Sequence, residues 1–421
     1  MATRKELLMI TYYFPPMGTI GTLRNYIFSK EMAKYFDKVH VITISNRPYP
    51  MKDKLDCDHI NMHEVRNYDY RVMNKGAAPA SYKRNTRVFT FMSRLVDSYP
   101  YNLWIGEGGR IYINSALSKG KEVIKQNNIS HIYSSFRPLA DHYIASKLKK
   151  QFPDLFWVAD FRDLHVDPVL KNVFAPERQH KANKAIISNA NLLTTVSEGL
   201  AYNLESYHPN RYVLHNGIYP LFKDIDVKEN KEKFTISYTG SMYGENRNPE
   251  LLLKAIQSLI KEGKIQKDKI QIKYAGKDFQ IWEDWVAKFD LQYLLVNCGY
   301  LSFKDSFRLQ RESHINLLLT YTGNNYTGGL TGKLYEYLAA ERPVFLIIKG
   351  DADHEFELLM EQSNAGILLY ADDQYLDQAK SYILNLYHSW EKEGSIPFTM
   401  NQDFLKKYHW EEMVVRLLGK L

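Results

Sequence analysis

The sequence predicts an α/β protein with two parallel sheets, each in its own domain. Short apolar runs alternate with amphipathic helical patterns along nearly the whole chain, and this alternation is typical of parallel sheets covered by helices. The 421 residues are enough for two separate cores, and the polar stretch 219–233 has the composition of a linker. We therefore expect two Rossmann-like domains, residues 1–222 and 223–402, followed by an amphipathic helix at 403–421.

Twelve strands are expected, six in each half of the chain. In the first half they are 7–13, 39–43, 131–134, 156–160, 192–196 and 212–215; in the second they are 235–239, 270–275, 293–297, 315–319, 344–348 and 367–370. Helices fit between most of them, for instance 249–261 and 353–362. The alternation breaks between residues 46 and 120, so no strand is assigned there.

Composition narrows the class of protein. A hydrophobic fraction of 45% and an aromatic fraction of 14% indicate a globular chain. Only two cysteines occur, Cys57 and Cys298, so we expect no disulfide framework and a reducing, cytoplasmic setting. The N-terminus lacks the apolar run of a signal peptide, and no stretch is long enough to span a bilayer. We expect a cytoplasmic protein, soluble or peripheral on the inner face of the cell membrane.

The positive charge is concentrated in one window, residues 66–96. It holds seven basic residues and one acid, a net +6 of the whole chain's +7. Its helical pattern at 83–96 places Val88, Phe91, Met92, Leu95 and Val96 on one face. Such a helix can lie on an anionic membrane surface, or it can pack on the N-domain core with its basic face in solvent. No recognition motif accompanies the charge, so nucleic acid is not an expected partner.

The most informative stretch is a strand, loop, helix and strand near the C-terminal end. An apolar strand, 315–319, is followed by a loop of small residues, 321–329, and then by a helix with Lys333 and Glu336 near its start. A helix N-terminus offers unpaired N–H groups and a partial positive charge, which suit a phosphate. One carboxylate a turn further in can accept both hydroxyls of a ribose. The segment predicts a site for a nucleoside diphosphate.

Another strand end, after residues 235–239, offers similar groups. Gly240 and Ser241 can lie against a phosphate, with Arg247 as the neutralising cation, although an ordinary strand-to-helix loop would have similar residues. Asn248 is expected as the N-cap of the next helix, with Pro249 at its first position.

The first strand leads into a glycine-containing turn. Gly18 and Gly21 can let successive N–H groups point into one concavity, and Arg24 follows one turn later. The spacing departs from the dinucleotide fingerprint, and a plain strand-to-helix turn remains the alternative.

Charged residues follow two further strands. Asp160, Arg162 and Asp163 stand at the carboxyl end of a strand, where doubly wound folds bind ligands, although Arg162 could simply pair with either aspartate. His142 starts a helix, either as a surface residue or as a catalytic one.

Three common kinds of site are not supported. The loop before Lys333 fails as a P-loop because Thr327 stands where that motif needs glycine, and Leu334 where it needs Ser or Thr. The histidines and cysteines show no metal-ligand spacing, and no G-x-S-x-G motif occurs. We expect no metal ion and no other cofactor.

Together these segments resemble glycosyltransferase family 4, the retaining GT-B enzymes, and in particular the bacterial branch that builds surface polysaccharides. The resemblance covers most of the chain and rests on Tyr12-Tyr-Phe-Pro-Pro with Gly18 and Gly21, on 160–163, 195–199, 215–218 and 238–241, and on 333–340 with Pro343-Val344. It departs at Gly328, where the family often has a first glutamate, and at Ser241, where it often has arginine.

The resemblance implies two domains facing across a cleft, with the C-terminal helix crossing back to the N-domain. The N-domain would take the acceptor and the C-domain the nucleotide sugar. Catalytic roles would fall to Lys333, Arg247 and His142, and Glu336 would bind the ribose. The remaining donor contacts would come from Gly18, Gly21, Gly240, Ser241, Gly329, Leu330, Thr331 and Gly332. The acceptor side would have Arg24, Asp160, Arg162 and Asp163.

The implied activity is transfer of a hexose or N-acetylhexosamine, with retention and without a metal ion. The donor would be a nucleoside diphosphate sugar, and the acceptor a hydroxyl of a glycan or lipid-linked glycan. Two alternatives remain open: a nucleotide-sugar 2-epimerase, and a non-catalytic protein that binds nucleotide sugars or glycans.

Overall fold

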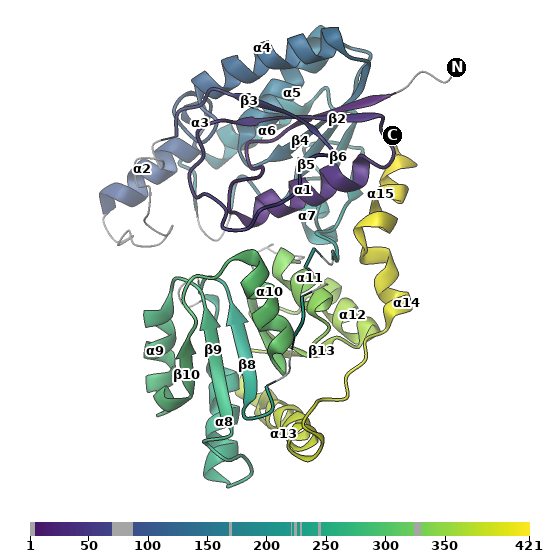
Figure 1. Cartoon of the computed structure of the whole chain (residues 1–421). Helices are drawn as coiled ribbons and strands as arrows, with labels where there is room; N and C mark the ends of the chain where they lie inside the picture. The colour runs from purple at the N-terminus through teal and green to yellow at the C-terminus, as the bar shows by residue number, and fades with distance from the viewer. Residues whose placement is uncertain are drawn as a thin grey trace. The chain divides into compact units, whose positions relative to one another are not determined.

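The computed structural model describes residues 5–69, 87–167, 171–219, 221–222, 225–227, 230–242, 246–323 and 330–421. The chain forms two compact units (Figure 1). An N-terminal unit runs to Gly217 and also includes Tyr408–Leu421, and a C-terminal unit includes Ile218–Gly323 and Leu330–Lys407.

The N-terminal unit is built on a parallel sheet of seven strands among its described residues. The strand order is β3-β2-β1-β4-β5-β6-β7. These strands are β1 Glu6–Ile10, β2 Lys38–Ile44, β3 Asn61–Val65, β4 Ile129–Phe136, β5 Phe156–Phe161, β6 Leu192–Thr195 and β7 Arg211–Val213. The helices are α1 Ile20–Met32, α2 Arg87–Asp97, α3 Tyr101–Trp104, α4 Arg110–Gln126, α5 Leu139–Gln151, α6 Pro176–Ile187, α7 Glu198–Asn203 and α15 Trp410–Leu418.

The C-terminal unit has a second parallel sheet, of six strands among its described residues, in the order β10-β9-β8-β11-β12-β13. They are β8 Phe234–Thr239, β9 Ile270–Ala275, β10 Leu295–Asn297, β11 Ile315–Tyr321, β12 Val344–Lys349 and β13 Gly366–Tyr370. The α-helices are α8 Glu250–Lys261, α9 Phe279–Ala287, α10 Phe303–Glu312, α11 Gly332–Ala340, α12 His354–Ser363, α13 Leu376–Glu393 and α14 Gln402–Leu405. Short 3₁₀ turns are η3 Gln292–Leu294, η4 Asp373–Tyr375 and η5 Lys406–Tyr408.

Both sheets have buried central strands because helices cover the sheets. The central strand β8 is buried along its whole length, and β4 and β11 nearly so. Since all strands of each sheet are parallel, their carboxyl ends meet at one edge, which is where the loops that carry the candidate residues begin.

All twelve predicted strands are present, with ends shifted by a few residues, and the α/β prediction is confirmed. The structure adds β3, Asn61–Val65, in the region where none was assigned. Among the described strands it pairs only with β2, at the sheet edge. Its residues are mostly exposed or half-buried, so it lacks the continuous apolar run of a central strand.

Two helix boundaries differ from the prediction. The N-cap of α8 is Pro249, not Asn248, and the helix begins at Glu250. Asn248 still serves the helix start, since its Oδ1 accepts from the Glu250 amide at 2.7 Å.

The single helix expected at 403–421 is broken. It forms α14, a 3₁₀ turn and α15, with extended backbone at His409. The break lets Tyr408 pack against His215 and Trp410 against Arg24, two contacts that one regular helix could not make from residues two apart. Figure 1 shows α15 beside α1, so the expected return of the C-terminal helix to the N-terminal unit is confirmed.

No helix in the described part of the chain is long and apolar enough to cross a bilayer.

Candidate functional site

The start of α11 carries the central candidate residues. Thr331 is its N-cap in extended conformation, but the Thr331 side chain makes no capping hydrogen bond. Its Oγ1 is buried and has no hydrogen-bond partner among the described residues. A buried hydroxyl without a partner is unusual in a folded protein. At a helix N-terminus, beside unpaired N–H groups, this hydroxyl is in place to donate to an anion.

Lys333 and Glu336 lie on the side of α11 that faces away from the core, because Leu334, Tyr335, Tyr337 and Leu338 are buried. Lys333 Nζ lies 2.7 Å from Glu336 Oε2, with the two side chains 17% and 26% exposed. Gln310 Nε2, from α10, donates to the same carboxylate oxygen at 3.4 Å and to Thr239 Oγ1 at 3.0 Å. The carboxylate is therefore held between two helices and the end of β8.

The loop after β8 meets this helix. Gly240 has φ +131°, a conformation that L side chains rarely adopt, and a Cβ added there would lie 3.9 Å from Lys333 Cε. The Gly240 carbonyl accepts from the Tyr274 hydroxyl at 3.0 Å. The Ser241 carbonyl accepts from Arg247 Nη1 at 2.6 Å and from the Tyr238 hydroxyl at 2.8 Å. These bonds fix the loop and the arginine together.

Electrostatics show which charges surround the end of β8. Burial raises the pKa of Tyr238 to about 12, and the charges of Arg247 and Lys333 act against that rise. Two cations and one carboxylate, Glu336, thus gather at the carboxyl end of one strand and the start of α11. The two cations can bind an anion. The carboxylate can accept hydrogen bonds from the hydroxyl groups of a ligand.

The other predicted residues of this loop and helix are placed as follows. Leu330 is buried, and its side chain anchors the chain before the helix. Gly332 is the first residue of α11. Gly328 and Gly329 lie outside the described residues.

In the N-terminal unit, Arg24 and Asp160 form a buried ion pair. Arg24 Nη2 lies 2.9 Å from Asp160 Oδ1, and the two side chains are 4% and 0% exposed. Arg24 also donates to the carbonyls of Leu214 at 2.9 Å and His215 at 2.8 Å. Burial raises the pKa of Asp160, but the charge and hydrogen bonds of Arg24 and further side-chain hydrogen bonds lower it overall. The pair is enclosed, so neither side chain offers an open surface in this structure, and their place on the acceptor side stays a prediction.

Arg162 does not form either of the ion pairs considered for it. Its Nε donates to the Phe136 carbonyl at 2.8 Å, and its Nη2 to the Arg137 carbonyl at 3.4 Å. A Cβ added at Gly21 would overlap Arg162 Nη1 and lie 2.9 Å from Arg162 Cζ. Glycine at this position therefore makes room for the half-buried guanidinium beside the start of α1. Asp163 is exposed.

Gly18 does not contribute a free amide as predicted. Its N–H donates to the Tyr49 carbonyl at 2.7 Å, and Met51 N donates to Pro16 O at 2.7 Å. The segment around Tyr49 thus covers the Gly18 turn, and the concavity expected from Gly18 and Gly21 together is not formed.

His142 is fully buried in α5, so the interpretation as a helix-surface residue is wrong. Its Nδ1 is hydrogen-bonded to Ser134 Oγ at 2.8 Å, and its ring lies 4.6 Å from Phe161. Burial lowers the pKa of His142 to about 3, so the imidazole is neutral near pH 7. An enclosed neutral ring does not reach a bound substrate in this arrangement.

Two residues at the carboxyl ends of the strands, Gln310 beside Glu336 and Arg137 after β4, were not predicted as site residues from the sequence. Gln310 was invisible because its contact with Glu336 joins residues 26 positions apart in different helices. Arg137, which follows β4, is surrounded by Asp97, Glu107 and Asp163, whose charges raise its pKa against the effect of burial. Its position after a strand was the only available signal.

Among the described residues, no group of three or more His, Cys, Asp or Glu side chains is placed to hold a metal ion.

Comparisons with known proteins agree on the fold. No family model matches the chain, and no curated protein matches it by sequence. Sucrose-phosphate synthase from Thermosynechococcus elongatus is similar in structure with a TM-score of 0.62 at 13% identity, covering 99% of this chain and 98% of that one. A trehalose-6-phosphate structure from E. coli bound with UDP-2-fluoro glucose has a TM-score of 0.59 at 12% identity and covers the same shares. The lipopolysaccharide outer core galactosyltransferase WaaB has a TM-score of 0.55 at 10% identity, again covering 99% and 98%. At these identities the likeness shows the fold alone: the chain has the GT-B fold of two-domain glycosyltransferases.

Proposed function

We propose that this chain is a retaining glycosyltransferase of the family 4 type. It transfers a sugar from a nucleoside diphosphate sugar to an acceptor hydroxyl, without a metal ion. The observation that carries the proposal is the set of groups at the start of α11. They are the buried Thr331 hydroxyl, which has no hydrogen-bond partner in the described part of the chain, and the Lys333–Glu336 pair. The GT-B fold supports it, as does the UDP-2-fluoro glucose in a structure of similar fold.

Donor binding rearranges the Lys333–Glu336 pair. The carboxylate of Glu336 accepts the ribose hydroxyls, while Lys333 turns from the carboxylate to the diphosphate. Arg247 supplies the second cation, and Thr331 Oγ1 and the amides at the start of α11 donate to phosphate oxygens. Each charge-assisted hydrogen bond of this kind contributes about 1.5–3 kcal/mol.

The transfer step needs no nucleophilic carboxylate. The bond between the anomeric carbon and the diphosphate oxygen breaks, and the electron pair leaves with the diphosphate. The acceptor hydroxyl attacks the oxocarbenium-like carbon on the same face and forms the new glycosidic bond. Its proton passes to the departing phosphate oxygen. Lys333, Arg247 and the α11 N-terminus accelerate the step by stabilising the charge that develops on the leaving group.

The N-terminal unit takes the acceptor, with Arg162 and Asp163 as the accessible charged groups. Arg24, Asp160 and His142 are positioning residues in this proposal, since each is buried. Gly18 and Gly21 shape the turn before α1, and Gly21 admits Arg162.

The proposal is tested by measuring release of nucleoside diphosphate from UDP-, GDP- and dTDP-sugars with lipid-linked glycan acceptors. Lys333→Ala and Arg247→Ala should lower turnover at least tenfold. Glu336→Ala should mainly raise the KM for the donor. Glu361→Ala, an exposed residue of α12, serves as the control and should behave as wild type.

Three results would count against the proposal. Unchanged kinetics in all three site variants would remove the site assignment. Donor binding without release of diphosphate would favour a non-catalytic protein, and conversion of UDP-GlcNAc without acceptor would favour a 2-epimerase.

We further propose that the acceptor is a membrane-bound glycan of bacterial surface polysaccharide synthesis, met at the inner face of the membrane. Support comes from an α2–α4 apolar surface whose large side chains are exposed: Phe91, Met92, Tyr101, Trp104, Ile105, Ile111 and Phe174. Helices α2, α3 and α4 contact one another in sequence, and the Phe91 and Phe174 rings lie 5.0 Å apart. Exposed apolar side chains on adjoining elements typically mark a surface that is covered in function.

Positive charge adjoins this surface. Arg110 is exposed at the start of α4, whereas Arg94 of α2 is held by the Val173 carbonyl at 3.0 Å. Arg66 is exposed after β3. The side chains of Arg71, Lys75, Lys83, Arg84 and Arg87 lie outside the described part of the structure. Apolar side chains beside basic ones suit an anionic lipid surface.

Sedimentation with lipid vesicles tests this part. The protein should bind vesicles of phosphatidylcholine with phosphatidylglycerol, and bind pure phosphatidylcholine at least tenfold more weakly. Trp104→Ser with Ile105→Ser should weaken binding tenfold, while Tyr202→Ser, 75% exposed on α7, should not. Equal binding to both kinds of vesicle would refute the electrostatic component.

A further inference from the structure

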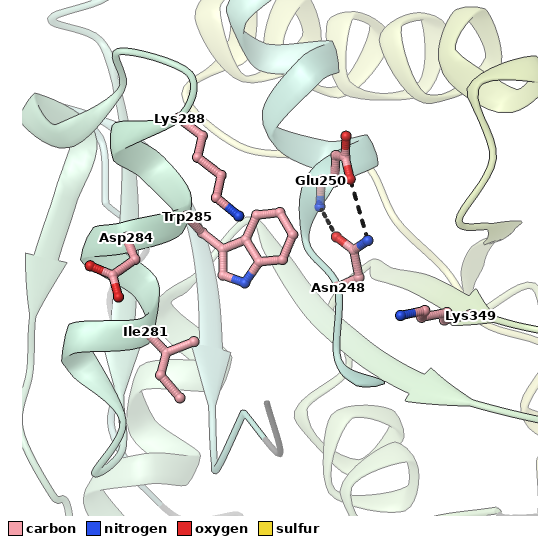
Figure 2. A pocket seen from close by; sticks show the side chains of 7 residues that line it. All are labelled: Asn248, Glu250, Ile281, Asp284, Trp285, Lys288 and Lys349. Atoms are coloured by element: carbon pink, nitrogen blue, oxygen red, sulfur yellow. Dashed lines mark hydrogen bonds between the residues drawn. The ribbon is translucent and has the colours of Figure 1, made fainter. Parts of the chain in front are cut away.

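A pocket in the C-terminal unit is lined by residues none of which belongs to the α11 site. Its volume is about 440 Å³, within the range of about 300–1,000 Å³ usual for small-molecule pockets. It is lined by Asn248, Glu250, Ile281, Asp284, Trp285, Lys288 and Lys349, from the start of α8, the outer face of α9 and the end of β12 (Figure 2).

The apolar part of the pocket comes from α9. Trp282 and Val286 are buried in the core of the unit, and this orientation turns Ile281, Trp285 and Lys288 towards the pocket. Trp285 is only half-buried, so part of its indole faces the open space. An indole offers a broad, rigid apolar face that a flat ligand can cover at small entropic cost.

Polar groups surround the indole. Asn248 and Glu250 are fixed to each other, since Asn248 Oδ1 accepts from the Glu250 amide at 2.7 Å and Asn248 Nδ2 donates to Glu250 Oε2 at 3.4 Å. Glu250 is further held by Lys254 at 3.0 Å. Figure 2 shows this pair on one side of the indole and Asp284 on the other.

The charges that line the pocket balance. Two lysines, Lys288 and Lys349, stand against two carboxylates, Glu250 and Asp284. A strongly charged ligand of either sign would meet as much repulsion as attraction here. A ligand with an apolar face and many hydroxyl groups fits better, because amide, carboxylate and ammonium groups together supply both donors and acceptors.

Lys288 covers part of the indole, with its Nζ 3.9 Å from the ring centroid. Lys288 is exposed. A cation–π contact at an exposed site contributes only about 0.5–1 kcal/mol. A ligand that buries more of the indole can therefore displace the ammonium and use it as a hydrogen-bond donor.

From these features we propose that the Trp285 pocket binds a neutral saccharide chain. The CH face of one sugar ring stacks on the Trp285 indole, and its hydroxyls bond to Asn248, Glu250 and Asp284. The pocket is a binding site and not a second reaction centre. The proposal does not depend on the glycosyltransferase activity, since every group it uses lies outside the α11 site.

The test uses the full chain and isothermal titration calorimetry with neutral hexasaccharides: maltohexaose, cellohexaose, chitohexaose and mannohexaose. Hexagalacturonate serves as an anionic comparison. At least one neutral chain should bind saturably. Trp285→Ala should weaken that binding at least tenfold, and Trp285→Phe should retain most of it.

Further variants guard against loss of folding in Trp285→Ala. Asp284→Ala alters an exposed residue that lines the pocket and should weaken saccharide binding several-fold. Glu283→Ala, exposed on the same helix but outside the pocket, should have no effect. All variants should keep the response to nucleoside diphosphates, which separates failure of this proposal from failure of the α11 site.

Binding of no neutral hexasaccharide would overturn the proposal. So would binding that Trp285→Ala and Asp284→Ala leave unchanged, or binding of hexagalacturonate alone.

Discussion

The Thr331 hydroxyl is not explained by folding contacts among the described residues. The Oγ1 atom is buried and without a partner among the described residues, although Thr331 is the N-cap of α11. A buried hydroxyl that makes no hydrogen bond costs about 1–3 kcal/mol, so a ligand that accepts from it recovers that free energy.

Thr331→Val should separate stability from donor binding. The variant keeps the shape of the side chain and removes only the hydroxyl, so we expect the free energy of unfolding to stay the same or rise slightly. Affinity for the nucleoside diphosphate should fall about tenfold, as expected for the loss of roughly one hydrogen bond to a charged group. Denaturant unfolding and nucleotide titration measure the two quantities. A loss of stability with unchanged nucleotide affinity would show that the hydroxyl has a folding role.

Gly21→Ala tests the close approach of Arg162 to the start of α1. The added methyl group would overlap the end of the Arg162 side chain, which is flexible and can move. We therefore expect a stability change within about 0.5 kcal/mol, since no core contact is lost. The KM for the acceptor should rise several-fold because Arg162 is displaced.

Gly419→Ala is the matched control for Gly21→Ala, since its added Cβ would approach only Arg416 O at 3.4 Å. A wild-type acceptor KM in Gly21→Ala would remove Arg162 from the acceptor side.

At the residue scale, the sequence indicated the types of side chain but not their contacts. Lys333 and Glu336 could be predicted to be neighbours because a helix brings positions three apart to one face. Arg24 and Asp160 could not be read as a pair, since they are 136 residues apart and meet only across two folded elements.

At the scale of elements, the Arg24–Asp160 pair connects α1 and β5 with the segment after β7. Trp410 of α15 closes over the pair, with the Arg24 guanidinium 5.2 Å from its ring. Four parts of the N-terminal unit thus meet at one buried charge pair.

Arg24→Met should destabilise the N-terminal unit by about 3–5 kcal/mol, because it leaves the Asp160 charge buried without its partner. The double variant Arg24→Met with Asp160→Asn should recover part of that loss. Denaturant unfolding of wild type, both single variants and the double variant measures the coupling. Additive effects of the two changes would contradict the account of the pair.

Elements with strong periodicity were predictable, and those defined by distant contacts were not. Strands β11 and β12 contain apolar runs, Leu317–Leu319 and Val344–Ile348, in a covered sheet, and their position followed from that pattern. Strand β3 lies at an edge and needs no such run. The break before α15 could not be foreseen, because it depends on Tyr408 and Trp410 both packing into the N-terminal unit.

At the scale of the whole molecule, buried histidines set the response to acid. Burial lowers the pKa of His142 and His165 to about 3, and that of His131 and His314 to about 4. These pKa values lie below the ordinary 6.5, so the stability that the neutral rings contribute is present above pH 6.5 and is lost as the pH falls towards 4.

Asp141 acts in the opposite direction. Burial raises its pKa to about 8, although hydrogen bonds from Tyr112 and the Tyr12 amide act to lower it. Its stabilising contribution is present below the ordinary value of 3.8 and is lost as the pH rises through 8.

We therefore expect stability to be greatest near pH 6.5, with a steep loss on the acid side and a shallower loss towards pH 8. Unfolding by denaturant at intervals between pH 4.5 and 8.5 measures this profile. Stability that keeps rising as the pH falls below 6.5 would contradict the assignment of neutral buried rings.

The two-unit organisation was predictable from length, alternation and the polar linker, whereas the place of the C-terminal helix was not. The amphipathic pattern of this helix predicts that one face is buried. It does not predict which unit that face packs against. The position of α15 was expected only from the family resemblance, and the structure places it on α1.

The central claim is that the start of α11 binds a nucleoside diphosphate, and a thermal-shift series tests it most directly. UDP, GDP, dTDP, ADP and CMP would each be added to wild type, Glu336→Ala and the control Glu361→Ala. A ligand at 100 times its Kd stabilises by about 2.7 kcal/mol, which raises Tm by several degrees. We expect a shift with one nucleoside diphosphate that Glu361→Ala keeps and Glu336→Ala loses. No shift with any nucleotide, or an equal shift in Glu336→Ala, would contradict the account.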